Sequence, residues 1–141
     1  MILSLLRSVG SVIAGMVVAF VPIIAAENFS SIYHPFPPGV DPSDLEVCRA
    51  HVARYPTWIL AVGATFWATA PLAGAWLATR LGTARHPAHG IVVGAILLAL
   101  AAFNMALLPY PVWFPIVNVV TFPLGTMLGV RLARRPRIQQ R

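Results

Sequence analysis

The sequence predicts an all-α polytopic membrane protein: a four-helix up-and-down transmembrane bundle with a short interfacial helix in its first outer loop. Of its 141 residues, 58% are hydrophobic and only 10% are charged, too few to cover a water-soluble globule of this size. A hydrocarbon core of about 30 Å needs roughly 20 apolar residues per helix. About four crossings therefore use most of the chain, and we expect residues 1–141 to form a single transmembrane domain.

The positions of the charged residues predict how these helices are oriented. All ten basic residues are arginines, and with the four acidic residues they give a net charge of +6. Five arginines directly follow the last apolar run: Arg131, Arg134, Arg135, Arg137 and Arg141. Arg7, Arg80 and Arg85 fall on the same side, as the positive-inside rule expects, whereas Arg49 and Arg54 fall on the other. We therefore expect a multi-pass protein of the cell inner membrane with both termini in the cytoplasm, and no nucleic-acid partner.

The first crossing, about 9–26, contains no charge and follows Arg7, so it is predicted to run from the cytoplasm outward. A signal peptide cleaved after Ala26 is the alternative. Ile24 is large for the position three residues before such a cut, where small residues are preferred. We expect the helix to be retained.

The outer loop, 27–56, holds all four acidic residues and the only cysteine. Its segment 33–39, Tyr-His-Pro-Phe-Pro-Pro-Gly, cannot be helical, because proline lacks a donor and pushes its predecessor into extended geometry. Ser43 followed by Glu46 matches a capping box. This pattern predicts a short helix over about 44–54, lying in the membrane interface.

Three further crossings follow. The second, about 57–81, begins after Pro56, a residue suited to a helix start. The third, about 91–108, meets the tight turn Pro109-Tyr110-Pro111, and the fourth spans about 112–133. Short links make consecutive helices antiparallel neighbours, which predicts the up-and-down arrangement.

Polar residues inside the crossings are the first candidates for a site, because in hydrocarbon they must find partners. Asn104 and Asn118 lie at similar depth on either side of the tight turn, and we expect them to hydrogen-bond across it. Glu27 and Thr65 fall near the same level. One hypothesis is an outward-facing pocket in which Glu27, held by the two asparagines, binds a proton or cation. The alternative is that the asparagines only join helices and Glu27 reaches water.

Aromatic residues gather near the predicted outer surface and suit binding at an interface. The candidates for a binding surface on the outer loop and the tight turn are His34, Phe36, Tyr110 and Trp113. An ordinary aromatic belt would place aromatic residues at the same level.

Metal and catalytic motifs are weak. Cys48 and His51, with His34 or Glu46, have spacing that could hold zinc, but no second Cys or His pair follows, so we expect no metal and no cofactor. The chain has no phosphate loop, no H-E-x-x-H and no G-x-S-x-G. An enzyme acting on lipid head groups through Glu27, His34 or His51 is the weaker alternative.

Glycines spaced four or five residues apart predict close approach of helices within the chain. These glycines are Gly10 and Gly15, Gly90 and Gly94, and Gly125 and Gly129.

Several segments together carry a resemblance: Glu27 closing the first helix, the stretch 33–41, Gly74 with Leu77, Ala78 and Arg80, and the stretch 108–113. On these residues the chain resembles a group of uncharacterised small four-helix membrane proteins found in bacteria. The resemblance implies a bacterial inner membrane and brings no catalytic role to any residue.

Taken together, these features favour a non-enzymatic membrane module that binds a lipid-like ligand or serves as an accessory subunit of a membrane protein complex. Its partners would be the lipid bilayer and either another membrane protein or further copies of itself. The alternative is an oligomeric transporter or channel subunit with an outward-facing polar site at Glu27, Asn104 and Asn118.

Overall fold

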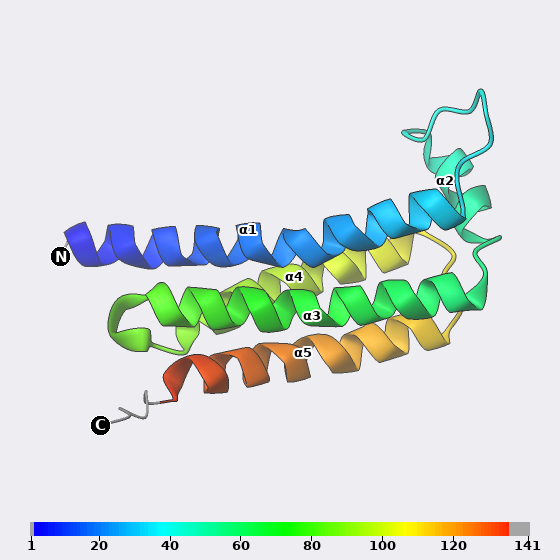
Figure 1. Ribbon diagram of the computed structural model, residues 1–141. Helices are drawn as coiled ribbons and strands as arrows, with labels where there is room; N and C mark the ends of the chain where they lie inside the picture. Colours follow the sequence, from blue (N-terminus) through cyan, green and yellow to red (C-terminus); the bar gives the residue numbers. More distant parts are fainter. Residues whose placement is uncertain (1, 136–141) are drawn as a thin grey trace.

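The computed structural model describes residues 2–135, and this part of the chain is all-helical, without strands. Its elements are α1 (Ile2–Tyr33), α2 (Leu45–Val52), α3 (Thr57–Leu81), the short 3₁₀ helix η1 (Thr83–Arg85), α4 (Ala88–Leu107) and α5 (Trp113–Arg134). Four of them, α1, α3, α4 and α5, are long and apolar enough to cross a membrane (Figure 1). The predicted class, an all-α bundle of four spanning helices with one short extra helix, is confirmed. Arg137 and Arg141 lie outside the described residues.

The spans agree with the predicted ranges except for the first. α3 begins and ends as predicted, and α4 and α5 differ from their predicted ranges only near their ends. α1, however, continues to Tyr33 instead of ending at residue 26. Asn28 Nδ2 donates to the carbonyl of Ile24 at 3.0 Å, and Ser31 Oγ donates to the carbonyl of Asn28 at 2.9 Å, so these polar side chains are satisfied within the helix. Glu27 therefore lies inside α1 and does not close it.

The short helix α2 is present, but its cap differs from the prediction. Asp44 is the N-cap, and its side chain accepts a hydrogen bond from the backbone N–H of Glu46 at 2.8 Å. Ser43 instead donates its N–H and its hydroxyl to Asp41 Oδ1, at 2.9 and 2.7 Å. Asp41 thus forms a turn just before the helix, which moves the cap one residue along the chain.

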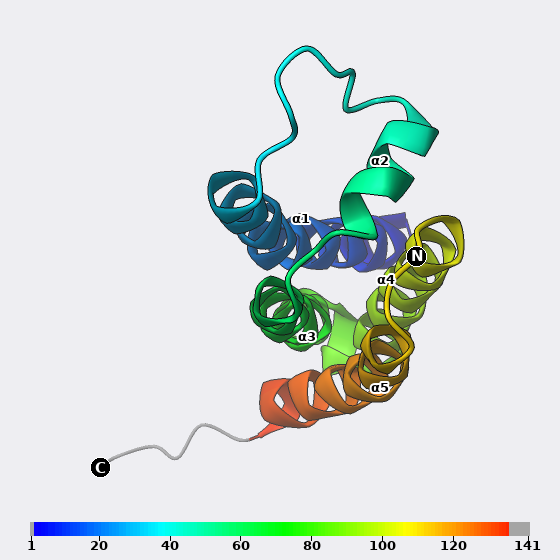
Figure 2. The same cartoon turned by 90° about the vertical axis from the view of Figure 1, so that its right-hand side faces the viewer.

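The bundle is organised around α3. This helix packs against α1, α4 and α5, and α1 and α5 lie on opposite sides of it (Figure 2). Consecutive spanning helices run in opposite directions. The last helix, α5, does not pack beside α1, so the four helices do not form a closed square in cross-section. Because α1 packs mainly against α3 and less against α4, the space between α1 and α4 depends on local side-chain size.

In the middle of the bundle that space is closed by small residues. A Cβ added to Gly15 of α1 would lie 2.7 Å from the carbonyl oxygen of Gly74 on α3 and 3.2 Å from Val93 on α4. The backbones of α1 and α3 therefore meet directly here, as small residues permit, and the Val93 side chain of α4 packs against their crossing point. Gly10 was predicted to share this face, but nothing lies within 4 Å of the position of its Cβ. The buried small residues of α1 are instead Ser11, Gly15, Ala19 and Ala26.

The other predicted glycines also pack within the chain. A Cβ on Gly90 would lie 2.7 Å from the carbonyl oxygen of Ala75, and one on Gly94 would collide with the side chain of Thr126. A Cβ on Gly129 would collide with the carbonyl oxygen of Leu72. The predicted close approach within the chain is confirmed for these positions.

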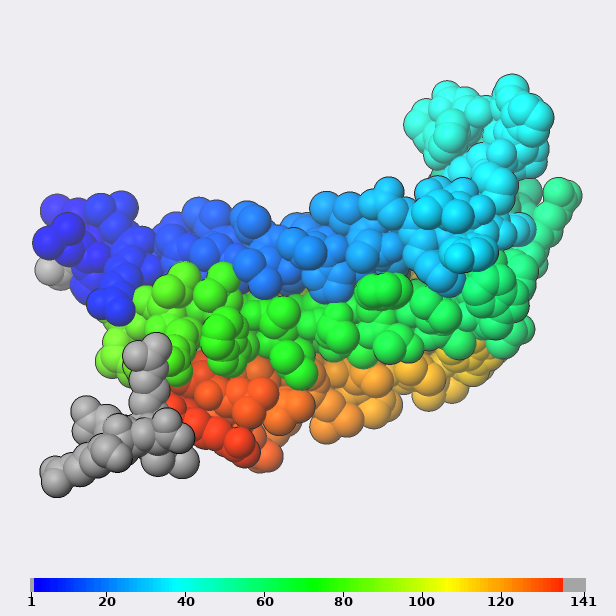
Figure 3. All heavy atoms as spheres, viewed as in Figure 1, coloured from blue at the N-terminus to red at the C-terminus, as the bar shows by residue number. Residues whose placement is uncertain are grey.

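The two ends of the bundle differ in charge. We call the end that carries the N-terminus and the end of α5 the terminal end, and the end that carries residues 34–56 the loop end (Figure 1). Residues 34–56, which we call the loop segment, protrude in cyan from the side of the bundle (Figure 3). The described arginines at the terminal end are Arg7, Arg80, Arg85, Arg131, Arg134 and Arg135. The four acidic residues all belong to the loop end.

A candidate site at the loop end

Two adjoining hollows occupy the loop end. The first, the loop-end cavity, has a volume of about 270 Å³ and is enclosed by α1, α2, α3 and the residues around Tyr110. The second, the lateral groove, has a volume of about 170 Å³ and lies between α1 and α4. Glu27, Trp67 and Asn104 line both hollows. The two hollows therefore lie side by side and meet at these three residues.

The lateral groove is apolar. Besides the shared residues, it is lined by Phe20, Ile23, Leu97, Leu100, Ala101 and Phe122. Phe20 and Leu100 are also exposed on the outside of the bundle, so the groove opens sideways between α1 and α4. Leu97 lies ten residues before the end of α4, which places the deep end of the groove about 15 Å below the end of that helix. The groove therefore extends well into the length of the apolar helices.

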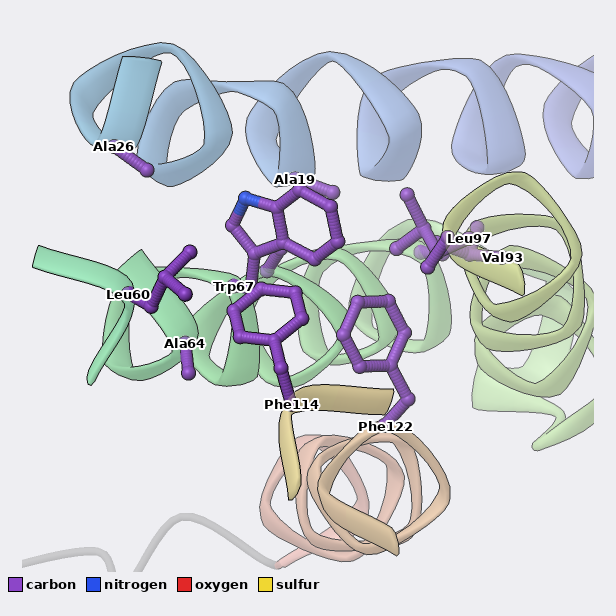
Figure 4. Close-up of a cluster of buried hydrophobic side chains, with 12 residues drawn as sticks. Ala19, Ala26, Leu60, Ala64, Trp67, Val93, Leu97, Phe114 and Phe122 are labelled. Atoms are coloured by element: carbon purple, nitrogen blue, oxygen red, sulfur yellow. The ribbon is translucent and has the colours of Figure 1, made fainter. Parts of the chain in front are cut away.

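The loop-end cavity is polar where it meets the groove. Tyr110 donates its hydroxyl hydrogen to Asn104 Oδ1 at 3.1 Å, which leaves the amide nitrogen of Asn104 as a donor. The indole nitrogen of Trp67 points towards α1, away from the core cluster formed with Phe114 and Phe122 (Figure 4). Donors from α3 and α4 thus line the same cavity wall as the Glu27 carboxylate.

Glu27 has no cationic partner in the described part of the chain, where the ion pair present joins Arg49 to Glu46 at 3.0 Å. The two tyrosines that line the cavity are neutral near pH 7. Burial raises the pKa of Tyr110, and the Glu27 carboxylate raises it further. The pKa of Tyr55 is raised by burial in the same way. Glu27 is the one carboxylic acid among the described residues that line the cavity.

Arg49 connects α2 to the end of α4. Its Nε donates to the carbonyl oxygen of Leu107 at 2.9 Å, and its Nη1 donates to Glu46 at 3.0 Å. A cation is favourable at this position because the carbonyls at a helix C-terminus carry partial negative charge. Arg49 is thus a structural contact of the loop segment, which accounts for a basic residue at this end.

Aromatic stacking holds the rest of the loop segment over the cavity. The ring centroids of Phe36 and His51 are 3.9 Å apart, and those of His34 and His51 are 4.4 Å apart. Tyr55 contacts both histidine rings. Burial lowers the pKa of His51, and the neighbouring His34 lowers it further, so His51 is neutral in this stack.

Of the residues predicted for the site, the structure brings four to the loop-end cavity: Glu27, Phe36, Asn104 and Tyr110. His34 is adjacent, in the stack, and lines a separate hollow on the surface of the loop segment. His51, named only for the weaker catalytic and metal hypotheses, also lines the cavity.

Three predicted residues lie elsewhere. Asn118 is completely buried, and its Nδ2 donates to the carbonyl of Phe114 at 2.8 Å, so the predicted bond to Asn104 is wrong. Thr65 donates its hydroxyl to the carbonyl of Ala61 at 2.9 Å and lines a shallow surface groove between α3 and α5 together with Trp113. These three residues face other sides of their helices and do not line the loop-end cavity.

Trp67 and Tyr55 line the cavity but were not predicted as site residues. A signal for Trp67 exists in the sequence. Tryptophan is typical of the membrane interface, whereas Trp67 lies about 15 Å along α3 from its start at Thr57. A tryptophan at this depth indicates an internal position with a partner or a cavity for its N–H.

No protein-family model, curated protein or solved structure matches this chain. Its four long apolar helices are those of a multi-pass membrane protein, and two adjoining hollows, one partly polar and one apolar, lie at its loop end.

Proposed function

We propose that this protein is a non-enzymatic membrane module that binds a lipid-like amphiphile. The polar head of the ligand occupies the loop-end cavity, and its hydrocarbon chain lies in the lateral groove. The observation that carries this proposal is that a partly polar hollow and an apolar hollow adjoin each other and share Glu27, Trp67 and Asn104 as lining residues.

The energetics of such binding favour selection by the head group. Burying a methylene from water is worth about 0.8 kcal/mol, but a chain that moves from the bilayer into an apolar groove leaves one apolar surrounding for another. The chain therefore contributes mainly through packing. Preference for one amphiphile over another arises at the polar end, where Glu27 and the donors of Trp67 and Asn104 lie.

We also propose the setting of this module. The excess of arginine at the terminal end supports a cytoplasmic location of both termini, since basic residues are retained on that side. The loop end would then face outward from a bacterial inner membrane. An amphiphile from the outer leaflet enters the groove sideways between α1 and α4, and an accessory role in a larger membrane complex is compatible with this route.

Transport by an oligomer is the second candidate, because a carboxylate lies within the first spanning helix and lines a cavity there. In this form the polar site consists of Glu27 and Asn104, without Asn118. Four helices are few for a pathway within one copy, so this reading requires self-association. Proton flux in vesicles that is lost in Glu27→Gln would favour it over the binding module.

Native mass spectrometry of the full chain, gently extracted from its own membrane, tests the binding proposal. We expect a retained small amphiphile. Ala101→Phe places a ring in the 170 Å³ lateral groove and should remove the bound mass. Ala99→Phe is the matched control, because it adds the same ring to an exposed position of α4 outside the groove. A protein without bound amphiphile, or equal retention in both variants, would contradict the proposal.

A further inference from the structure

The loop-end cavity combines one carboxylate with several aromatic side chains. Phe36 and Tyr55 come from the loop segment, Trp67 from the middle of α3, and Tyr110 from the turn between α4 and α5. Together with Glu27 of α1, these residues surround a hollow of about 270 Å³. A cavity lined by a carboxylate and several aromatic rings favours an organic cation, because the faces of the rings carry negative electrostatic potential.

The cavity wall carries no positive charge in the described part of the chain. Arg49, the arginine nearest in sequence to the cavity-lining residues of α2, has its guanidinium engaged by Leu107 and Glu46 and does not line the cavity. His51 does line the cavity and is neutral, since burial and the adjacent His34 lower its pKa. An anionic head group would therefore meet Glu27 without a compensating cation.

We propose that the head group bound in the loop-end cavity is an organic ammonium, either a primary amine or a quaternary ammonium. The cation pairs with the Glu27 carboxylate and packs against the rings of Trp67 and Tyr110. A bound cation also favours the ionised form of Glu27, because opposite charges stabilise each other in a site with little water. The inference rests on the proposed function and names its ligand class.

Amphiphiles of equal chain length and different head group test this inference. The full chain is purified in a neutral sugar detergent and titrated with dodecyltrimethylammonium, dodecanoate and tetramethylammonium, with binding followed by tryptophan fluorescence. We expect dodecyltrimethylammonium to bind about tenfold or more tightly than dodecanoate, because the cation gains an ion pair with Glu27 whereas dodecanoate meets the same carboxylate as a like charge. Equal affinity, or a preference for dodecanoate, would overturn the ammonium inference and leave the amphiphile proposal standing.

Tetramethylammonium separates the two proposals. It carries the same head group without a chain, so it should bind more weakly than dodecyltrimethylammonium if the groove holds the chain. Equal binding of these two cations would retain the ammonium site and overturn the lipid-like ligand.

Glu27→Gln identifies the residue responsible. This nearly isosteric change should bring the affinities for dodecyltrimethylammonium and dodecanoate to within about threefold of each other, because the ion pair is lost. The matched control is Glu46→Gln, which removes one negative charge from an exposed position of the same end and keeps an acceptor for Arg49. An unchanged preference in Glu27→Gln, or an equal loss in both variants, would contradict the assignment to Glu27.

Discussion

The same helices pack closely in one half of the bundle and leave a hollow in the other. We call the half next to the terminal end the terminal half, and the half next to the loop end the loop half. In the terminal half, glycines allow backbones to meet, as where Gly129 of α5 faces the carbonyl of Leu72 on α3. In the loop half, the helices carry Trp67, Leu97 and other large side chains, and a hollow remains between α1 and α4. Close packing at one end thus holds helices that are separated at the other. A binding cavity and a stable bundle can in this way coexist in a chain of 141 residues.

The largest expected effect comes from adding a methyl group in the packed half. In Gly129→Ala the new Cβ meets the carbonyl oxygen of Leu72 and lies 3.0 Å from the backbone nitrogen of Trp76, and backbone atoms cannot move aside cheaply. Overpacking of this kind costs about 1–3 kcal/mol. Unfolding titrations in mixed detergent should show this loss.

Gly63→Ala provides the comparison for that experiment, because nothing lies within 4 Å of the position of its Cβ. Its stability should change by less than about 1 kcal/mol, the scale of helix propensity. Equal effects of Gly63→Ala and Gly129→Ala would show that the terminal half is not held by close backbone packing.

A smaller effect is expected from pH in the loop half. The pKa of His51 is lowered by burial first and then by His34, with Arg54 acting in the same direction. His51 therefore binds a proton more readily in the unfolded loop than in the folded stack. The stabilisation by neutral His51 is present above about pH 6.5, and it is lost as the pH falls through the lower pKa of His51 in the folded protein. Tyr55 also contacts the ring, and Glu27 lines the same cavity.

Hydrogen exchange measured on α2 across this pH range, corrected for intrinsic rates, should rise at acid pH while the spanning helices stay protected. In His51→Phe, which can stack but not titrate, the rise should disappear. A rise that persists in this variant would assign the pH dependence to another group.

The difference between the halves also explains what the sequence predicts well. The spans follow from hydropathy and from prolines, since these set where hydrocarbon begins and ends along the chain. The depth of a polar residue follows from counting along a helix, and Glu27 and Asn104 were placed at the same level in this way. Both line the loop-end cavity.

The direction in which a residue faces is harder to predict. Asn118 lies at the depth of Asn104, but it is four residues from Phe114 and from Phe122, so it shares their buried face. A uniformly apolar helix gives no stripe that would reveal this rotation. For the same reason the sequence did not reveal that Thr65 and Trp113 face the shallow groove between α3 and α5. Cavities are harder still, because they depend on how far two helices diverge.

Fluorescence of Trp67 offers the most direct test of the central claim, that a lipid-like chain occupies the groove. Trp58, Trp76 and Trp113 are replaced by phenylalanine, and the protein is placed in vesicles containing phosphatidylcholine with brominated chains. Trp67 is only 9% exposed but lines both hollows, so a chain in the groove should quench it strongly. We predict that Ala101→Phe abolishes this quenching and that Ala99→Phe preserves it. Absence of quenching, or equal quenching in both variants, would contradict the account.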